Sequence, residues 1–290
     1  MRIAVIGARG QLGAAVAREC APAHQVTALA HDDLDIANDA AVATVIGRLR
    51  PEAIVNCAAY NNVDGAEDHP VDALNVNAFA VRALARAAAA AGATLVHYST
   101  DFVFDGKTAR PYTEDDLPNP RSVYAASKLI GEWFAADAPR AYVLRVESLF
   151  GSVPGVRPAR GSVASILNAI ATGSEARVFE DRTTSPTYVI DAAAATRRLI
   201  ELNPPPGVYQ CVNSGSCTWL EFAQELARLL GIEPRLIPVR MADVRLKAQR
   251  PQYCALSNAK LASVGISMPT WQDALARYLK EGVPRGMSPA

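Results

Sequence analysis

The sequence lacks both an excess of charge of either sign and a hydrophobic run long enough to cross a membrane. Its 290 residues include 29 Lys and Arg and 29 Asp and Glu, so the formal net charge is zero. A chain without net charge has no overall field to attract nucleic acid or an anionic membrane surface. The alanine-rich stretch 83–93 is interrupted by Arg86 and is much shorter than the ~20 residues of a membrane span. We therefore expect a cytoplasmic protein with neither nucleic acid nor a membrane as partner.

Cysteine and histidine are too few and too scattered to form a metal-binding or disulfide pattern. The five cysteines are an odd number without a C-x-x-C pair, and the four histidines show no spacing typical of metal ligands. We interpret the cysteines as reduced thiols and predict no catalytic metal. The chain also has no G-x-S-x-G elbow, which argues against the hydrolases that are built around that motif.

The first half of the chain alternates short apolar runs with helical patterns. Buried strands are predicted at 2–6, 25–29, 53–56, 94–99 and 141–146, and helices between them at 11–20, 40–50, 72–91 and 122–136. Strands that alternate with helices of this length form βαβ units, in which helices cover both faces of a parallel sheet. The sequence therefore predicts an α/β protein with a Rossmann-like, doubly wound parallel sheet.

Three glycines stand between the first predicted strand and the first predicted helix, in Gly7-Ala-Arg-Gly10-Gln-Leu-Gly13. Such a turn lets a pyrophosphate approach the backbone N–H groups at the N-terminus of the helix. The spacing G-x-x-G-x-x-G is one residue longer than the usual dinucleotide fingerprint. Its position between a strand and a helix nevertheless predicts a bound dinucleotide.

The end of the second predicted strand bears on the choice of dinucleotide. Sites specific for NAD usually place Asp or Glu there, where the carboxylate holds the ribose 2′-hydroxyl. Here the strand is followed by Ala30 and His31, and the first acid is Asp32. Arg9, inside the glycine turn, could meet a 2′-phosphate. We therefore predict NADPH as the cofactor, with NADH as the alternative.

The second half of the chain is less regular. Pro154, Gly155, Pro158 and Gly161 indicate a long loop after the fifth strand. Beyond it we predict a strand at 208–212, an amphipathic helix at 219–230 and a last helix at 271–280. We therefore divide the chain into a dinucleotide-binding domain, residues 1–150, to which roughly 180–203 return, and a smaller α/β substrate lobe, 151–290.

Tyr124 and Lys128 are the most informative pair of residues for the chemistry. They form a Y-x-x-x-K pattern, and a helix presents positions four apart on one face. A nearby cation lowers the pKa of a phenol, which can then exchange a proton near neutral pH. Thr100 stands upstream at the end of a predicted strand. Together with the glycine turn, these residues indicate proton transfer beside a dinucleotide.

In this order the motifs resemble those of the extended short-chain dehydrogenase/reductases, and more closely those of the dTDP-4-dehydrorhamnose reductase family. That family's phrase Val-Asn-Ala-Ala-Ala-Tyr-Thr-Ala-Val-Asp-x-Ala-Glu corresponds to Val-Asn-Cys-Ala-Ala-Tyr-Asn-Asn-Val-Asp-Gly-Ala-Glu at 55–67. Its Ser-Thr-Asp-Tyr-Val-Phe-Asp-Gly corresponds to Ser-Thr-Asp-Phe-Val-Phe-Asp-Gly at 99–106. Further matches at 34–36, 207–209 and 250–251 extend the resemblance over nearly the whole chain.

The resemblance implies hydride transfer from a reduced nicotinamide to a keto group on a nucleotide-linked sugar. Tyr124 would donate a proton to the forming alkoxide, Lys128 would hold the nicotinamide ribose and lower the pKa of Tyr124, and Thr100 would hydrogen-bond the carbonyl oxygen. The implied cofactor-binding residues are Gly7, Arg9, Gly10, Gln11, Leu12, His31, Asp35, Ile36, Cys57, Ala58, Ala59, Tyr60, Tyr124 and Lys128. The implied substrate-binding residues are Asn61, Val63, Asp101, Phe102, Glu147, Leu149, Arg182 and Arg250.

The departures from the family's pattern fall on the expected substrate side. Phe102 stands where the family usually has Tyr, and Arg182 where Gln is common. The family's Arg-Thr-Ser-Trp-Val-Tyr is replaced by Arg-Val-Glu-Ser-Leu-Phe at 145–150, which removes a Trp and introduces Glu147. We therefore expect a reductase whose substrate differs from dTDP-4-dehydrorhamnose.

Several alternatives remain open at this point. The chain could be a regulatory member of the family that binds NADP without turnover, or a reductase of a carbonyl substrate that is not a sugar. A dehydratase is disfavoured, because Phe102 follows Asp101 where dehydratases carry a second acid. A homodimer is left open, as are the sugar, the nucleotide and the stereochemistry.

Overall fold

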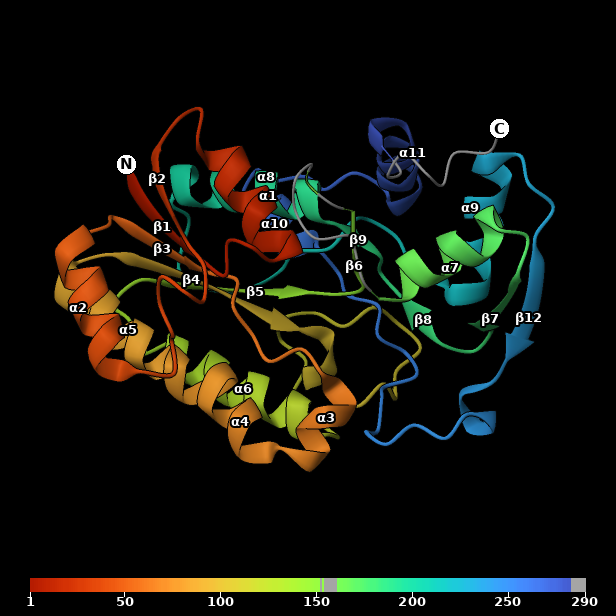
Figure 1. Ribbon diagram of the computed structural model, residues 1–290, viewed down its shortest axis with the longest axis horizontal. Coiled ribbons are helices and arrows are strands. Elements are labelled where there is room, and N and C mark those ends of the chain that lie inside the picture. Colours follow the sequence, from red (N-terminus) through yellow and green to blue (C-terminus); the bar gives the residue numbers. More distant parts are fainter. Residues whose placement is uncertain (152, 154–160, 283–290) are drawn as a thin grey trace.

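The computed structural model describes residues 1–151, 153 and 161–282. Its centre is a parallel sheet of six strands in the order β10-β5-β4-β3-β1-β2 (Figure 1). The strands are β1 (Arg2–Ile6), β2 (Gln25–Leu29), β3 (Ala53–Asn56), β4 (Thr94–Thr100), β5 (Ala141–Val146) and β10 (Gly207–Gln210). The first five match the predicted strands closely, and the predicted Rossmann-like fold class is confirmed.

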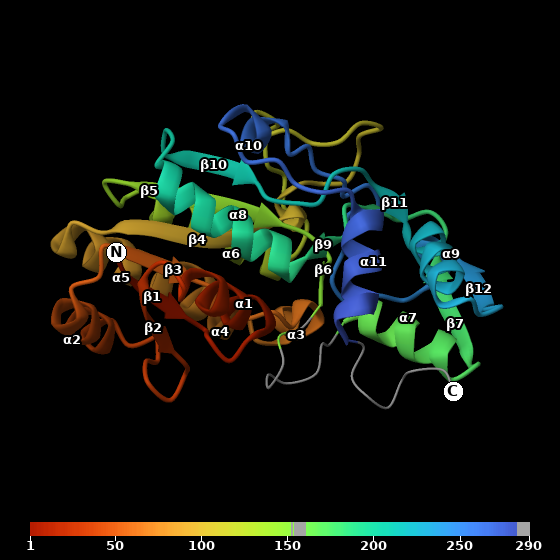
Figure 2. The same cartoon turned by 90° about the horizontal axis from the view of Figure 1, so that it is seen from above.

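Helices cover both faces of this sheet (Figures 1 and 2). One face carries α2 (Asp39–Leu49), α5 (Ala80–Ala91) and α6 (Val123–Ala135), and the other α1 (Gln11–Cys20) and α8 (Val189–Leu202). Successive strand residues point to opposite faces, so Val5 belongs to one apolar cluster and Ile6 to the other. Burial on both faces explains why the strand sequences are continuously apolar.

The single helix predicted at 72–91 is wrong in its N-terminal part. The chain forms α3 (Val63–Asp68), α4 (Pro70–Leu74), a π-helical turn (Asn75–Phe79) and only then α5. Pro70 begins α4, as expected for a residue without a backbone N–H. The π turn meets α6 at Gly131, where a Cβ atom would lie 2.1 Å from the Asn77 carbonyl oxygen. Close packing against α6 therefore accompanies this local departure from α-helical geometry.

The smaller lobe contains elements that local sequence patterns did not predict. The strands β7 (Glu175–Phe179) and β12 (Arg235–Val239) pair in parallel beside α7 (Ser162–Ala171) and α9 (Trp219–Leu230). The helix α9 was predicted, and a capping box between Thr218 and Glu221 begins it. Pro154, Gly155 and Pro158 of the predicted loop lie outside the described residues, whereas Gly161 is the N-cap of α7.

Short elements complete the fold and connect its parts. They are β6 (Leu149–Phe150), β8 (Thr183–Thr184), β9 (Thr187–Tyr188), β11 (Cys217–Thr218), two 3₁₀ turns (Asp101–Val103 and Met241–Asp243), α10 (Ala259–Ser263) and α11 (Trp271–Gly282). None of the described helices is long and apolar enough to cross a membrane.

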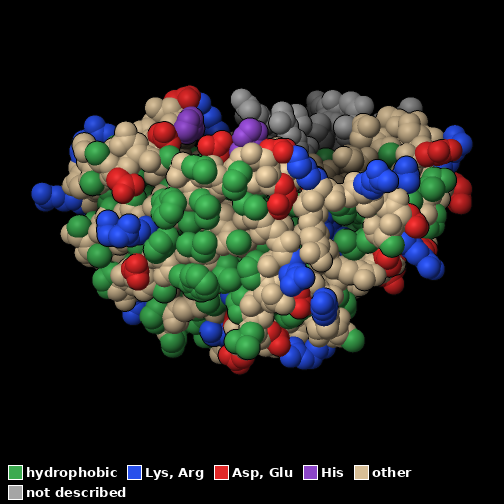
Figure 3. Space-filling model, turned by 90° about the horizontal axis from the view of Figure 1, so that it is seen from below, with side chains coloured by type: hydrophobic (Ala, Val, Ile, Leu, Met, Phe, Trp, Pro, Cys, Tyr) green, Lys and Arg blue, Asp and Glu red, His purple; other side chains and the backbone are tan. Residues whose placement is uncertain are grey.

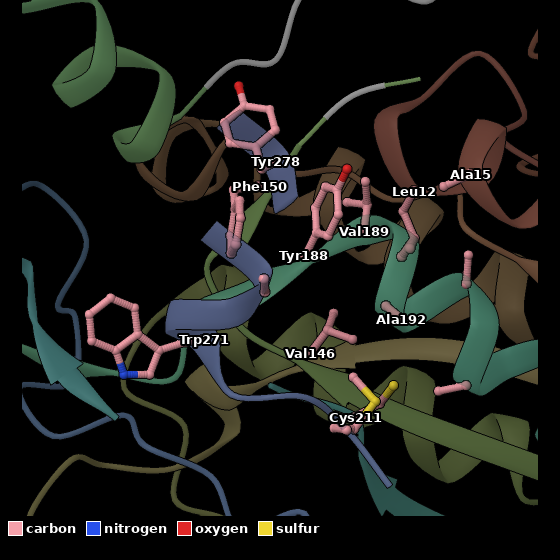
Figure 4. Close-up of a cluster of buried hydrophobic side chains, with 14 of the residues drawn as sticks. Leu12, Ala15, Val146, Phe150, Tyr188, Val189, Ala192, Cys211, Trp271 and Tyr278 are labelled. Carbon is pink, nitrogen blue, oxygen red and sulfur yellow. The ribbon is translucent and has the colours of Figure 1, made fainter. Parts of the chain in front are cut away.

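The two parts of the molecule share one apolar core (Figure 4). Phe150 stacks on Tyr188 at 5.4 Å between ring centroids, and Tyr278 of α11 packs edge-on against Phe150 at 5.7 Å.

The segment that returns to the main sheet extends beyond the predicted residues 180–203. Strand β10, at 207–210, pairs with β5 and forms an edge of the main sheet. The chain therefore returns to the sheet for longer than its loop composition indicated.

Hydrophobic side chains gather on the outer face of α4, α5 and α6 (Figure 3). Val71 is 65% exposed, Phe79 49% and Trp133 63%. Phe79 packs beside Phe134, with ring centroids 6.3 Å apart. This surface lies on the helices and away from the strand ends that form the site described next.

Candidate active site

A cavity of about 450 Å³ lies at the carboxyl ends of β1, β3, β4 and β5. The strand order reverses between β1 and β3, and ligands of open α/β sheets bind in the crevice at such a switch point. Most predicted site residues line it: Gly10, Gln11, Leu12, Cys57, Ala58, Ala59, Asn61, Val63, Thr100, Asp101, Phe102, Tyr124, Lys128, Glu147, Leu149, Arg182 and Arg250. A larger hollow of about 720 Å³ at the opposite strand ends is lined mainly by alanines, glycines and exposed charges.

The glycine turn fits a pyrophosphate group. Gly7 has φ +78°, and a Cβ atom there would lie 2.8 Å from the Ala58 backbone nitrogen. A Cβ atom on Gly13 would lie 2.3 Å from the Gly7 carbonyl oxygen, so α1 packs directly on the turn. Gly10 donates its N–H to the same oxygen at 2.9 Å and is the N-cap of α1. The N-terminus of α1, which favours anions, therefore faces the cavity.

Several predicted cofactor residues do not line the cavity. Arg9 and His31 are exposed, and the Arg9 guanidinium forms an ion pair with Asp32, which lowers the pKa of that carboxyl. Asp35 accepts a hydrogen bond from the Ala37 N–H at 3.0 Å. Ile36 is buried in the core beside α2, and Tyr60 exchanges backbone hydrogen bonds with the Asn77 side chain. These residues lie on the loops that surround the strand ends, beyond the described cavity wall.

Lys128 and Tyr124 reach the cavity from the first turns of α6. Ser122 begins this helix by accepting a hydrogen bond from the Ala125 N–H at 3.3 Å. The Lys128 ammonium donates to the Tyr98 carbonyl oxygen at 2.6 Å. Burial lowers the pKa of Lys128 to about 8, and the charge of Glu132 acts in the opposite direction. The ammonium is therefore held charged near neutral pH inside a buried site.

The expected lowering of the Tyr124 pKa is wrong for this structure. Burial raises the pKa of Tyr124 above its ordinary value, the negative charge of Asp101 raises it further, and Thr100 opposes the shift. The Tyr124 ring also packs edge-on against Phe102 at 5.8 Å. The phenol is consequently protonated at neutral pH, which is the form that donates a proton.

Thr100 completes the group of reactive side chains at the end of β4. Its hydroxyl donates to Asp101 Oδ1 at 2.9 Å and accepts from the Phe102 N–H at 3.2 Å. In this arrangement the hydroxyl proton is directed to Asp101. Thr100 can donate to a carbonyl oxygen only after its hydrogen bond to Asp101 is broken or after Asp101 is protonated.

A buried ion pair joins α6, the helix that carries Tyr124 and Lys128, to the main sheet. Arg145 of β5 donates two hydrogen bonds to Glu132 of α6, at 2.8 and 2.7 Å. Ser99 of β4 donates to the same carboxylate at 2.5 Å, and the Arg145 guanidinium lies 5.0 Å from the centre of the Phe104 ring. Glu132 follows Lys128 by one helical turn, so the pair fixes α6 relative to β4 and β5.

Comparison with known proteins places the chain in a family. Residues 1–283 match the family model described as the RmlD substrate binding domain. The chain belongs to this family. It is 34% identical to the spore coat polysaccharide biosynthesis protein SpsK of Bacillus subtilis, with 97% of each chain covered. It is 35% identical to a dTDP-4-dehydrorhamnose reductase of Streptomyces griseus, covering 93% of this chain and 90% of the relative.

Solved structures of similar proteins agree with this membership in the RmlD family. A dTDP-4-dehydrorhamnose reductase from Bacillus anthracis, in complex with NADP, superposes with a TM-score of 0.91 at 32% identity. A dTDP-4-dehydrorhamnose reductase from Clostridium acetobutylicum superposes with a TM-score of 0.90, also at 32% identity. Each comparison covers 97% of this chain and 99% of the other. The predicted family is confirmed, and the roles of individual residues stay predictions.

In this member of the RmlD family, part of the cavity wall was missed from the sequence. Gly13 of the predicted glycine turn lines the cavity, and so do the following residues, which were not predicted as site residues: Tyr98, Ser99, Val146, Ser148, Gly161, Ser162, Val163 and Trp219. Trp219 is an aromatic residue of the cavity lining in a chain that lacks the family's Trp after β5, and its side chain is buried against Phe222. It occupies the apolar face of α9, and amphipathic patterning alone cannot distinguish such a residue from core.

Proposed function

We propose that this chain is a reductase that uses NADPH to convert a keto group of a nucleotide-linked sugar into an alcohol. The observation that carries this proposal is that Thr100, Tyr124 and Lys128 line one cavity with the glycine turn. The names of similar proteins support it, because several are dTDP-4-dehydrorhamnose reductases and one was solved in complex with NADP. NADPH, when bound, supplies the hydride.

The residues around the glycine turn suit the cofactor. Gly7 and Gly13 leave room for a pyrophosphate close to the backbone, and the first turn of α1 offers N–H groups to it. Arg9 is an exposed cation that can bind a 2′-phosphate once it is released from Asp32. We propose NADPH as the preferred cofactor because this guanidinium has an exposed partner that a phosphate can displace.

The proton-transfer groups then act on the sugar carbonyl. Tyr124 donates its proton to the forming alkoxide, since burial keeps the phenol protonated. The Lys128 ammonium is charged below about pH 8 and stabilises the phenolate that remains. Thr100 stabilises the developing charge on the carbonyl oxygen through its hydroxyl.

Two further features of the cavity suit the diphosphate of a nucleotide sugar. The N-terminus of α7 faces the cavity at Gly161 and Ser162, and a helix N-terminus favours a negative group. Arg250 also lines the cavity, and it forms a two-point ion pair with Asp64 at 3.0 and 2.8 Å. A diphosphate can take over one of these interactions when it binds.

A titration followed by turnover tests the proposal. Purified protein is titrated with NADPH and NADH, and oxidation of each cofactor is followed with a panel of 4-keto nucleotide sugars. Tyr124→Phe is expected to abolish turnover and to leave NADPH binding near normal, whereas Tyr278→Phe, outside the cavity, should retain both. Tight NADPH binding without oxidation of any sugar in the panel would instead support a regulatory protein or a different carbonyl substrate. A Tyr124→Phe variant that keeps most of the rate would show that Tyr124 is not the proton donor.

A further inference from the structure

Two strand ends bring a group of polar side chains together deep in the cavity. Thr100 and Val146 are partners in the register of β4 and β5, so the following residues, Asp101 and Glu147, lie side by side. Ligand atoms of Asp101, Glu147 and Cys254 all lie within 4.8 Å of one another. Asp101, Glu147 and Arg182, which we call the buried triad, all line the cavity and are only 3%, 2% and 9% exposed.

The backbone directs Glu147 into this position. Ser148, the next residue, has φ +44°, a left-handed conformation that costs a non-glycine residue ~1 kcal/mol or more. Both oxygens of the Glu147 carboxyl have partners, the hydroxyl of Thr184 and the Ser185 N–H at 2.8 Å. Glu147 is thus a fixed member of the triad, and its hydrogen-bonding capacity is largely used within the protein.

The other two members of the triad have unused hydrogen-bonding atoms. Asp101 Oδ2 and Arg182 Nε are buried and have no hydrogen-bond partner among the described residues. The one hydrogen bond found for the Arg182 side chain runs to the Cys254 sulfur at 3.8 Å, and sulfur is a weak acceptor. Leaving a buried polar atom unpaired costs ~1–3 kcal/mol. An unpaired acceptor and an unpaired donor on two residues that line the cavity therefore point to a ligand that pairs with both.

The charges of the triad indicate which kind of ligand this is. Burial raises the pKa of Asp101 to about 6 and raises that of Glu147 above its ordinary value, and the charge of Asp101 raises the pKa of Glu147 further. The charge of the Arg182 guanidinium acts in the opposite direction on both carboxyls and offsets their negative charge. Because the triad already contains a cation beside its two carboxyls, it does not call for a charged ligand. A hydroxyl group is neutral, donates one hydrogen bond and accepts another.

We propose that Asp101 and Arg182 recognise a hydroxyl-bearing substituent on a carbon that neighbours the sugar carbonyl. The hydroxyl donates to Asp101 Oδ2 and accepts from Arg182 Nε. Its place beside the carbonyl follows from the bond between Asp101 and Thr100, the residue proposed to contact the carbonyl oxygen. This assignment rests on the proposed function. It predicts a substrate that keeps a hydroxyl where a deoxysugar has hydrogen or a methyl group.

Matched substrates test the assignment. The values of kcat/KM are measured with NADPH for 4-keto nucleotide sugars that differ by one hydroxyl, as 6-hydroxy against 6-deoxy and 3-hydroxy against 3-deoxy pairs. One pair is expected to show a preference of about tenfold or more for the hydroxylated member, because the deoxy compound leaves Asp101 and Arg182 unpaired. Equal values in both pairs would overturn the assignment while leaving the reductase activity established. A failure of every sugar would instead contradict the proposed function.

Two arginine variants identify the residue responsible. In Arg182→Met the preference should fall towards one, chiefly through a lower kcat/KM for the hydroxylated sugar. Arg250→Met also removes a cation from the cavity wall but lies outside the triad, so it should lower kcat/KM for both members of a pair and leave their ratio unchanged. NADPH affinity and the unfolding midpoint, measured for each variant, separate a local effect from misfolding. If Arg182→Met folds, binds NADPH and keeps the wild-type preference, the triad does not recognise the hydroxyl.

Discussion

Replacement of Lys128 by methionine is expected to make the protein more stable while it removes turnover. Burial lowers the pKa of Lys128 from 10.5 to about 8. The folded state therefore holds this proton less tightly than the unfolded chain does. At ~1.4 kcal/mol for each tenfold change in proton affinity, the buried ammonium costs about 3 kcal/mol of folding free energy below pH 8, where both states are protonated.

The size of the stabilisation also depends on the hydrogen bond that Lys128→Met removes. The Lys128 ammonium donates to the Tyr98 carbonyl oxygen at 2.6 Å, and losing a hydrogen bond costs ~1 kcal/mol. The expected net stabilisation is therefore about 2 kcal/mol at pH 7. Between about pH 8 and 10.5 the unfolded chain binds more protons than the folded one, so wild-type stability contributed by this group rises with pH. The advantage of Lys128→Met should shrink over the same interval.

Urea unfolding at pH 7 and pH 10 measures the effect, with NADPH oxidation as the readout of turnover. Lys107→Met serves as the matched control. Because Lys107 is exposed, its removal should change neither the free energy of unfolding nor the rate of NADPH oxidation. The reasoning would be refuted if the wild type were at least as stable as Lys128→Met at pH 7. It would also be refuted if the difference between them did not depend on pH.

Three other predictions follow from contacts in and below the site. Gly7→Ala should weaken NADPH binding by tenfold or more in a fluorescence titration, because its Cβ atom would lie 2.8 Å from the Ala58 nitrogen; unchanged affinity would contradict this. Glu132→Gln should lower the free energy of unfolding in urea by about 3 kcal/mol, since it leaves Arg145 buried without a counter-charge; a loss below ~1 kcal/mol would argue against the pair's structural role. In a pH series, kcat/KM should fall above about pH 8 as Lys128 loses its proton, and a flat profile up to pH 10 would show that its charge is not needed.

Some expectations are not tested by the fold or by the comparisons. The cytoplasmic location, the absence of a nucleic-acid partner and the homodimer stay predictions. The exposed apolar residues on α4, the π turn and α6 can be examined by measuring the oligomeric state in solution.

The sequence by itself determined those features that depend on neighbouring positions in the chain. Strands buried on both faces are continuously apolar, so β1 to β5 could be predicted within a residue or two. Tyr124 and Lys128 could be assigned to one site because a helix brings positions four apart to one face. The glycine turn could be identified because its requirement for small residues is met within seven consecutive positions.

Only the tertiary structure decided how the other residues of the cavity are arranged around the reactive pair and the glycine turn. The family resemblance already implied that Asp101, Glu147 and Arg182 bind substrate, but only strand register places Asp101 beside Glu147. The path of the smaller lobe brings Arg182 to the same cavity and adds Trp219, which was not predicted. The pKa of Tyr124 likewise depends on burial and on Asp101, which outweigh the effect expected of the lysine in the motif. Burial and contacts between distant segments are set by packing and cannot be read from local spacing. The sequence therefore determined the reactive pair and the cofactor turn, whereas tertiary packing decided the environment that selects the substrate.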